Sequence, residues 1–205
     1  MASLALSTPA TVLYKTERGE TGVHLRLLSA EQGMLTAIQR RSTKTVQAHP
    51  LADIFDHGLF MLERRALGGG PWYVREFIVE RRRPLLANHY ESFETACRFA
   101  TLLDRNAVHV EHHDRLISVL NRALDAWETG TAPQAVLCKA LYLLLRDEGH
   151  PVKEQWWAEL PDGARERAAH LIGTPLDAQT VPPEEAATLV KSLLHWMVGH
   201  ADYVV

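Results

Sequence analysis

The chain has 205 residues, of which 46% are hydrophobic and 23% charged, which excludes a disordered or fibrous protein and permits one large domain or two small ones. Residues 1–84 hold 12 Lys and Arg against 8 Asp and Glu, a net charge of +4, whereas residues 85–205 hold 10 against 17, a net charge of −7. This division indicates a polyanionic partner that is bound by the first part of the chain only.

The N-terminal segment MASLALSTPA predicts no targeting signal, because it has no basic residues and only a short apolar run. No stretch approaches the roughly 18 apolar residues of a membrane span. We therefore expect a cytoplasmic protein with no membrane partner. The two cysteines, Cys97 and Cys138, fall in helical patterns, which predicts buried thiols without a disulfide.

Residues 1–84 are patterned as short strands separated by turns. Residues 23–29 show the alternation clearly, with Val23, Leu25 and Leu27 on one face and His24 and Arg26 on the other. Five short strands in about 80 residues suit a small closed or partly open β-barrel, for which the OB-fold and the SH3-like barrel are two solutions. The predicted domain covers residues 8–82, with strands at 10–16, 23–29, 34–41, 51–67 and 72–80.

Beyond Pro84 the apolar residues recur with the period of a helix, which predicts an all-α domain over residues 84–205. Ser92 is the expected N-cap of the first helix. Gly130 and Gly149 are expected to end the second and third helices. Residues 150–163 read as a loop, with Trp156 and Trp157 packed onto the helices. The predicted helices cover residues 92–104, 114–128, 133–148 and 163–172, and a last one opens at Pro182-Pro183.

The basic residues of the β part are candidates for binding nucleic-acid phosphates, and nearby aromatic rings are candidates for stacking on bases. The wider set also includes Arg75, Arg81 to Arg83 and Trp72. The alternative is that these arginines are ordinary surface residues balanced by the eight acidic residues. The residues assigned to DNA binding are Lys15, Arg18, Arg26, Arg40, Arg41, Lys44, Arg64, Arg65, Tyr14 and Tyr73.

A second candidate is the cluster of His109, His112 and His113, whose spacing on a helix is a metal-ligand spacing. A metal enzyme built on these histidines is one hypothesis, and a solvated helix start is the alternative. No GxSxG motif, cysteine–histidine signature or P-loop is present. We therefore assign no catalytic residue, metal or cofactor and predict that the chain is not an enzyme.

Several short motifs follow one another in the first 45 residues. They are ATVLYKT at residues 10–16, Gly19-Glu20, LRLLS at 25–29 and EQGMLTA at 31–37, followed by the basic segment RRSTK at 40–44. In this order they resemble the start of the bacterial recombination mediator RecO family. The order of a small OB-fold and a helical domain also matches that family, and residues 193–200 are similar to its closing helix.

The resemblance implies a non-enzymatic protein of DNA repair and recombination that binds DNA, single-stranded more than double-stranded. It also implies two protein partners, RecR and the acidic C-terminal tail of single-stranded-DNA-binding protein. A tail that ends in Phe would need an apolar pocket with a basic rim in the helical domain. The basic residues available there are Arg98, Arg105, Arg115, Arg122 and Lys139.

One feature of that family is missing from the sequence. Many members carry a cysteine zinc site in the helical domain, but no CxxC follows Gly149-His150-Pro151-Val152, so zinc is not implied. The missing cysteines and the modest charge of +4 favour an alternative function. In this alternative the chain is a protein-interaction module of RecO-like architecture that has lost DNA binding.

Overall fold

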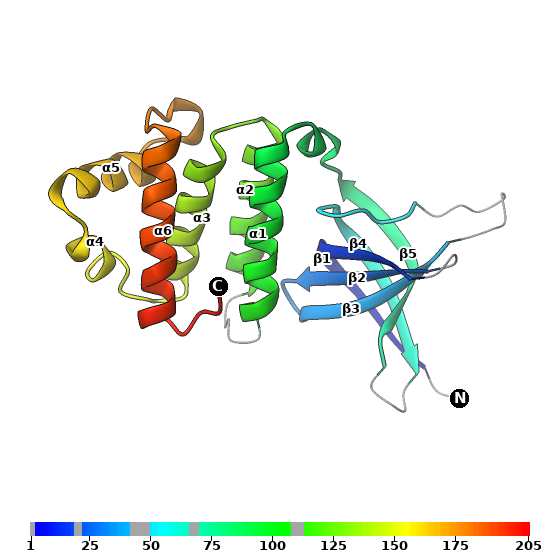
Figure 1. Ribbon diagram of the computed structural model, residues 1–205. Helices are drawn as coiled ribbons and strands as arrows, with labels where there is room; N and C mark the ends of the chain where they lie inside the picture. Colours follow the sequence, from blue (N-terminus) through cyan, green and yellow to red (C-terminus); the bar gives the residue numbers. More distant parts are fainter. Residues whose placement is uncertain (1–2, 19–21, 42–49, 66–69, 108–112) are drawn as a thin grey trace. The chain divides into compact units, whose positions relative to one another are not determined.

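The computed structural model describes residues 3–18, 22–41, 50–65, 70–107 and 113–205 (Figure 1). These residues belong to two compact units, one over residues 1–83 and the other over residues 84–205. The first unit is built of strands and the second of helices. The predicted order of a β part followed by a helical part is therefore confirmed.

The strands of the first unit pair in an order that closes on itself. Neighbours follow the order β1-β2-β3-β5-β4, and β4 pairs again with β1 to complete a barrel. All pairs are antiparallel except β3 and β5, whose parallel contact is limited to Ala37 with Trp72 and Ile38 with Tyr73. The strands are β1 (Ser3–Arg18), β2 (Gly22–Ser29), β3 (Gly33–Arg40), β4 (His57–Arg65) and β5 (Trp72–Arg81).

The first strand is longer than the predicted 10–16 because its two halves have different partners. Its first half pairs with β4 and its second half, from Ala10 onward, pairs with β2. The register shifts between Val12 and Tyr14, so that Tyr14 lies opposite Arg26. The barrel interior is apolar, and Phe60 and Phe77 stack within it with their ring centroids 4.3 Å apart.

The predicted strand 51–67 is wrong over its first residues, since β4 begins only at His57. The preceding segment is irregular and is held by side chains. The amide of Gln39 donates to the carbonyl of Pro50 (3.0 Å) and accepts from the amide of Ala52 (2.9 Å). Phe55 has a φ of 66°, and its carbonyl accepts a hydrogen bond from the buried Arg83 (2.8 Å). Contacts of this kind, made by side chains distant in the sequence, hold the segment in an irregular course despite its apolar residues.

Two carboxylates of this segment titrate in opposite directions. Burial raises the pKa of Asp56, although the amide of Asp53 (2.9 Å) and the charges of Arg82 and Lys15 act the other way. Burial also tends to raise the pKa of Asp53, but the hydrogen bond from Lys15 (3.0 Å) and the amide of Ile54 outweigh burial and lower it. The two groups therefore make the stability of the barrel depend on pH with opposite signs.

We expect Asp56→Asn to change the pH profile of barrel stability. The folded barrel binds the Asp56 proton more tightly than the unfolded chain does. The protonated Asp56 therefore stabilises the barrel fully below pH 3.8, and this stabilisation is lost as the pH rises through the raised pKa. In Asp56→Asn the stability of the barrel should not show this decrease with rising pH. In Asp53→Asn the opposite loss, which occurs as the pH falls, should disappear. The measurement is the urea midpoint from about pH 3 to about pH 7, and identical profiles for Asp56→Asn and the wild type would contradict the assignment.

The second unit contains four longer helices that stand side by side, α1, α2, α3 and α6 (Figure 1). Two shorter helices, α4 and α5, precede α6. None of the helices in the described part of the chain is long and apolar enough to cross a membrane. The helices are α1 (Tyr90–Asn106), α2 (His113–Glu128), α3 (Pro133–Asp147), α4 (Trp156–Glu159), α5 (Asp162–Gly173) and α6 (Pro183–His200), with 3-10 turns η1 (Pro84–Asn88) and η3 (Leu176–Ala178).

Most predicted helix boundaries are confirmed. Gly130 and Gly149 follow α2 and α3 with φ of 74° and 82°, the left-handed conformation that ends helices. The predicted N-cap at Ser92 is wrong, because α1 begins at Tyr90 and Ser92 is buried within it. The predicted loop 150–163 is also wrong in part, since Trp156–Glu159 forms α4.

Trp127, Trp156 and Trp196 are buried in the core of the helical unit. Trp127 lies edge-on to Phe99 and donates to the carbonyl of Pro133 (3.2 Å). Trp156 is buried as expected and donates to Ser192 on α6 (3.0 Å). Both cysteines are free thiols, Cys138 buried and Cys97 half-buried, and burial raises the pKa of Cys138 to about 12. Such a thiol is inert at neutral pH.

Candidate functional site

Residues assigned to DNA binding lie in cross-strand rows on the outer face of the barrel. Tyr14 is opposite Arg26, which donates to Thr36 on β3 (2.7 Å). Arg18 and Arg40 are both opposite Gly22, the first residue of β2 and two residues before His24. Neither β2 nor β3 contains Asp or Glu. The intervening row consists of Thr16, His24, Ile38 and Tyr73.

Two arginines lie over the aromatic residues that begin β5. The guanidinium of Arg40 is 5.7 Å from the ring centroid of Tyr73, and that of Arg64 is 4.3 Å from the ring centroid of Trp72. Trp72 packs partly buried against the barrel core, whereas Tyr73 is 37% exposed. We call Arg40, Arg64, Arg65, Trp72 and Tyr73 the arginine–aromatic cluster.

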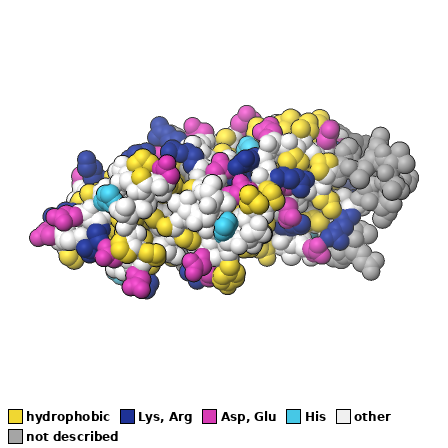
Figure 2. All heavy atoms as spheres, turned by 90° about the horizontal axis from the view of Figure 1, so that it is seen from above, with side chains coloured by type: hydrophobic (Ala, Val, Ile, Leu, Met, Phe, Trp, Pro, Cys, Tyr) yellow, Lys and Arg dark blue, Asp and Glu magenta, His cyan; other side chains and the backbone are white. Residues whose placement is uncertain are grey.

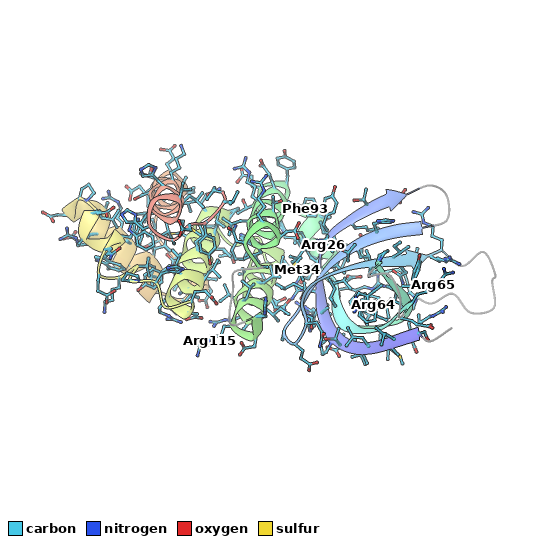
Figure 3. The ribbon with its side chains drawn as sticks, turned by 90° about the horizontal axis from the view of Figure 1, so that it is seen from below. Arg26, Met34, Arg64, Arg65, Phe93 and Arg115 are labelled. Carbon is cyan, nitrogen blue, oxygen red and sulfur yellow. The ribbon has the colours of Figure 1, made fainter. Side chains whose placement is uncertain are left out.

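The barrel pattern explains how Arg64 meets Trp72. Arg64 follows Leu62 by two residues on β4, so its side chain emerges on the same inner side of the sheet. In Figure 3 Arg64 lies within the curve of the barrel strands, whereas Arg65 follows it at the end of β4. Arg64 therefore covers Trp72 where the barrel ends, and Arg65 is exposed to solvent.

Two carboxylates on the barrel strands are bound to cations outside the cluster. Glu17 pairs with Arg41, and Glu63 pairs with Arg75, whose hydrogen bond lowers the pKa of Glu63. Within the described ranges, Arg40 and Arg64 have aromatic partners and no carboxylate partner. Basic and acidic side chains are interspersed over the face seen in Figure 2. The cluster is therefore distinguished by arginines that have no carboxylate partner among the described residues, and not by a strongly positive surface around it.

The ten residues assigned to DNA binding thus fall into five groups. Arg40, Arg64, Arg65 and Tyr73 belong to the cluster, in which Arg40 contacts Tyr73, Arg64 contacts Trp72, and Arg65 follows Arg64 at the end of β4. Lys15 and Arg41 are engaged by Asp53 and Glu17, and Tyr14 and Arg26 lie farther along the outer face. Arg18 ends β1, and Lys44 lies outside the described residues. The sequence analysis did not single out His24, although the alternation of residues 23–29 already placed it beside Arg26.

The helical unit contains a hollow of about 230 Å³ between α2, α3 and the chain that follows α5. Two of the five basic residues expected near an apolar pocket, Arg122 and Lys139, line it. Arg98, Arg105 and Arg115 do not. Pro175 and Leu176, which the sequence analysis missed, close one side. The apolar lining is completed by Val119, Ala123, Val136, Ala140 and Leu143. We call this hollow the α2–α3 pocket.

The charge at the α2–α3 pocket is positive and partly desolvated. Burial lowers the pKa of Lys139, and the nearby positive charge of Arg122 lowers it further. The Nζ of Lys139 donates to the carbonyl of Thr174 (2.7 Å). An anionic group bound between the two cations would relieve their repulsion. The pocket is therefore suited to an amphipathic ligand that carries a negative charge.

The histidine cluster gains no support from the described part of the chain. His113 begins α2, and its Nε2 lies 3.0 Å from the carbonyl of Ala107. His109 and His112 lie outside the described residues. Among the residues that the structure does describe, no group of three or more His, Cys, Asp and Glu side chains could hold a metal ion.

No protein-family model matches this chain, and no curated protein has a significantly similar sequence.

Proposed function

We propose that the chain is a non-enzymatic, cytoplasmic DNA repair and recombination protein of the RecO type, whose barrel is an OB-fold that binds DNA, preferentially single-stranded. The strand order β1-β2-β3-β5-β4 and the short parallel contact of β3 with β5 support the OB-fold. OB-folds bind oligonucleotides through the face of strands 2 and 3 and through the loops between strands 1 and 2 and strands 4 and 5. Of the arginine–aromatic cluster, Arg64 and Arg65 end strand 4, Trp72 and Tyr73 begin strand 5, and Arg40 ends strand 3.

The observation that carries the proposal is the contact of Arg40 with the exposed ring of Tyr73. A cation over an exposed ring contributes about 0.5–1 kcal/mol, whereas stacking of a base on an aromatic residue contributes about 1–3 kcal/mol. A base can therefore replace the Arg40 guanidinium on the ring face of Tyr73, and Arg40 can then bind a phosphate. Trp72 is partly buried and covered by Arg64, so we assign stacking to Tyr73 and phosphate contacts to Arg40 and Arg65.

Photocrosslinking tests this assignment. We expect an oligonucleotide that carries 5-bromodeoxyuridine to crosslink to Tyr73, with the modified peptide identified by mass spectrometry. Tyr90, on the helical unit, is the internal control because it is 76% exposed, twice as much as Tyr73. Crosslinks at Tyr90 but not at Tyr73 would show that exposure alone decides the reaction and would overturn the assignment.

The α2–α3 pocket supports a second role, the docking of a protein partner. Its apolar lining and its two cations, Arg122 and Lys139, match the acidic tail with a terminal Phe that the resemblance implies for single-stranded-DNA-binding protein. The same feature would serve the alternative function, a RecO-like interaction module without DNA affinity. No described feature points to RecR, which remains an expectation from the resemblance alone.

We expect the peptide acetyl-Asp-Asp-Asp-Phe, with a free carboxylate, to bind the wild-type protein in isothermal titration calorimetry. Arg122→Glu should weaken binding about tenfold or more, because it places a negative charge beside the ligand. Arg146→Glu on the same helix pair is the matched control, since Arg146 is exposed, pairs with Asp147 and does not line the pocket. Equal losses in the two variants would show a general charge effect and would contradict docking in the pocket.

A further inference from the structure

One wall of the α2–α3 pocket is a short segment that we call the strap, residues Thr174–Gln179, which includes η3. The strap leaves α5 after Gly173 and contributes Pro175 and Leu176 to the pocket. The amide of Ala178 donates to the carbonyl of Pro175 (3.1 Å) within the strap, and the Nε2 of Gln179 donates to the carbonyls of Thr174 (2.9 Å) and of Leu171 on α5 (2.8 Å). The strap thus has a defined shape of its own.

Lys139 joins the strap to α3. Its Nζ donates to the carbonyl of Thr174 over 2.7 Å, the same carbonyl that accepts from Gln179. Lys139 also lines the pocket, beside Arg122. A lysine ammonium has three donors, so Lys139 can hold Thr174 and contact a ligand at the same time. Arg122 lines the same pocket, and the described structure gives it no hydrogen bond to the strap.

We propose that Lys139 couples occupancy of the pocket to the order of the strap, so that an anionic ligand bound between Arg122 and Lys139 tightens the strap against α3. This inference rests on the docking role proposed above and adds a conformational response to it. A bound carboxylate fixes the side chain of Lys139 and favours its charged form, which strengthens the hydrogen bond to Thr174. Linkage requires the reverse as well: a strap that is held in place binds the ligand more tightly.

Hydrogen exchange of the full chain, read by mass spectrometry on peptides that cover the strap, tests the coupling. The probe is acetyl-Asp-Asp-Asp-Phe at a concentration that saturates each variant. In the wild type the strap should exchange several-fold more slowly when the peptide is bound. Lys139→Met should abolish this slowing. Arg122→Met should need more peptide but, once saturated, should show the slowing of the wild type. Each variant removes one positive charge from the pocket lining, so the pair is matched.

The same variants without peptide test the contact itself. Lys139→Met should make the strap exchange several-fold faster, whereas Arg122→Met should leave it unchanged. Equal strap exchange in the two variants, free and bound, would overturn the coupling. If the wild type does not bind the peptide, both the docking role and the coupling are contradicted. The comparison without peptide then still shows whether Lys139 holds the strap against α3. Circular dichroism of each variant verifies that the helical unit is folded.

Discussion

The double variant Arg40→Glu/Arg65→Glu is expected to bind single-stranded DNA at least about tenfold more weakly than the wild type, irrespective of base sequence. Both side chains are exposed at strand ends, and the described structure gives neither of them a carboxylate partner. Each lost phosphate contact should also reduce the slope of log affinity against log salt by about 0.7. The measurement is fluorescence anisotropy of a labelled oligothymidylate at low salt.

The control must change the charge of the chain by the same amount. Arg98→Glu/Arg105→Glu does so on α1, where both side chains are exposed and Arg98 pairs with Glu94 (2.8 Å). We expect this variant to bind DNA nearly as well as the wild type. A loss of equal size in both double variants would show that net charge, and not the arginine–aromatic cluster, determines the affinity.

The second large effect concerns the stability of the helical unit. Trp127→Ala should lower its free energy of unfolding by about 3–5 kcal/mol, because a fully buried indole is removed and the cavity cannot close completely. Trp127→Phe should cost less, roughly 1–3 kcal/mol, since it keeps a ring beside Phe99 but leaves the carbonyl of Pro133 without its donor. Urea unfolding followed by far-UV circular dichroism gives these values.

Tyr90→Ala is the matched control for Trp127, because it also removes an aromatic ring but from an exposed position on α1. Its effect should stay within about 0.5 kcal/mol. If Trp127→Ala were no more destabilising than Tyr90→Ala, burial of Trp127 would not stabilise the helical unit.

The helices could be predicted from the sequence because their signals are local. The predicted helix 114–128 differs from α2 by one residue, and 133–148 differs from α3 by one residue. A stripe of apolar residues gives the buried face, and Gly130, Pro133 and Gly149 mark the ends. Ser92 was misplaced because α1 begins at Tyr90 with His89 as its N-cap and no side-chain capping bond.

The strands were harder to predict because their partners are distant in the sequence. The first half of β1 pairs with β4, so that Ser3 lies opposite Arg65. The local sequence of residues 3–9 contains no signal that predicts this pairing with β4. Residues 51–56 look apolar enough for a strand, yet they are held in an irregular course because the amide of Ala52 donates to Gln39 and the carbonyl of Phe55 accepts from Arg83.

For the candidate site, the sequence predicted residue types but not their partners. Lys15 and Arg41 have the same chemistry as Arg40 and Arg65, but only the fold brings Asp53 and Glu17 to them. The α2–α3 pocket shows the same limit. Arg122 and Lys139 were among five candidates, and Thr174, 35 residues from Lys139, meets it only in the fold.

The central claim is that the barrel binds single-stranded DNA through unneutralised arginines beside an exposed ring. A titration of labelled oligothymidylate with the wild-type chain, from about 50 mM to about 200 mM salt, tests it most directly. We predict measurable binding at the lowest salt and a linear fall of log affinity with log salt, with a slope of about −1.4 for the two assigned phosphate contacts. The absence of binding at the lowest salt, or an affinity independent of salt, would contradict the claim.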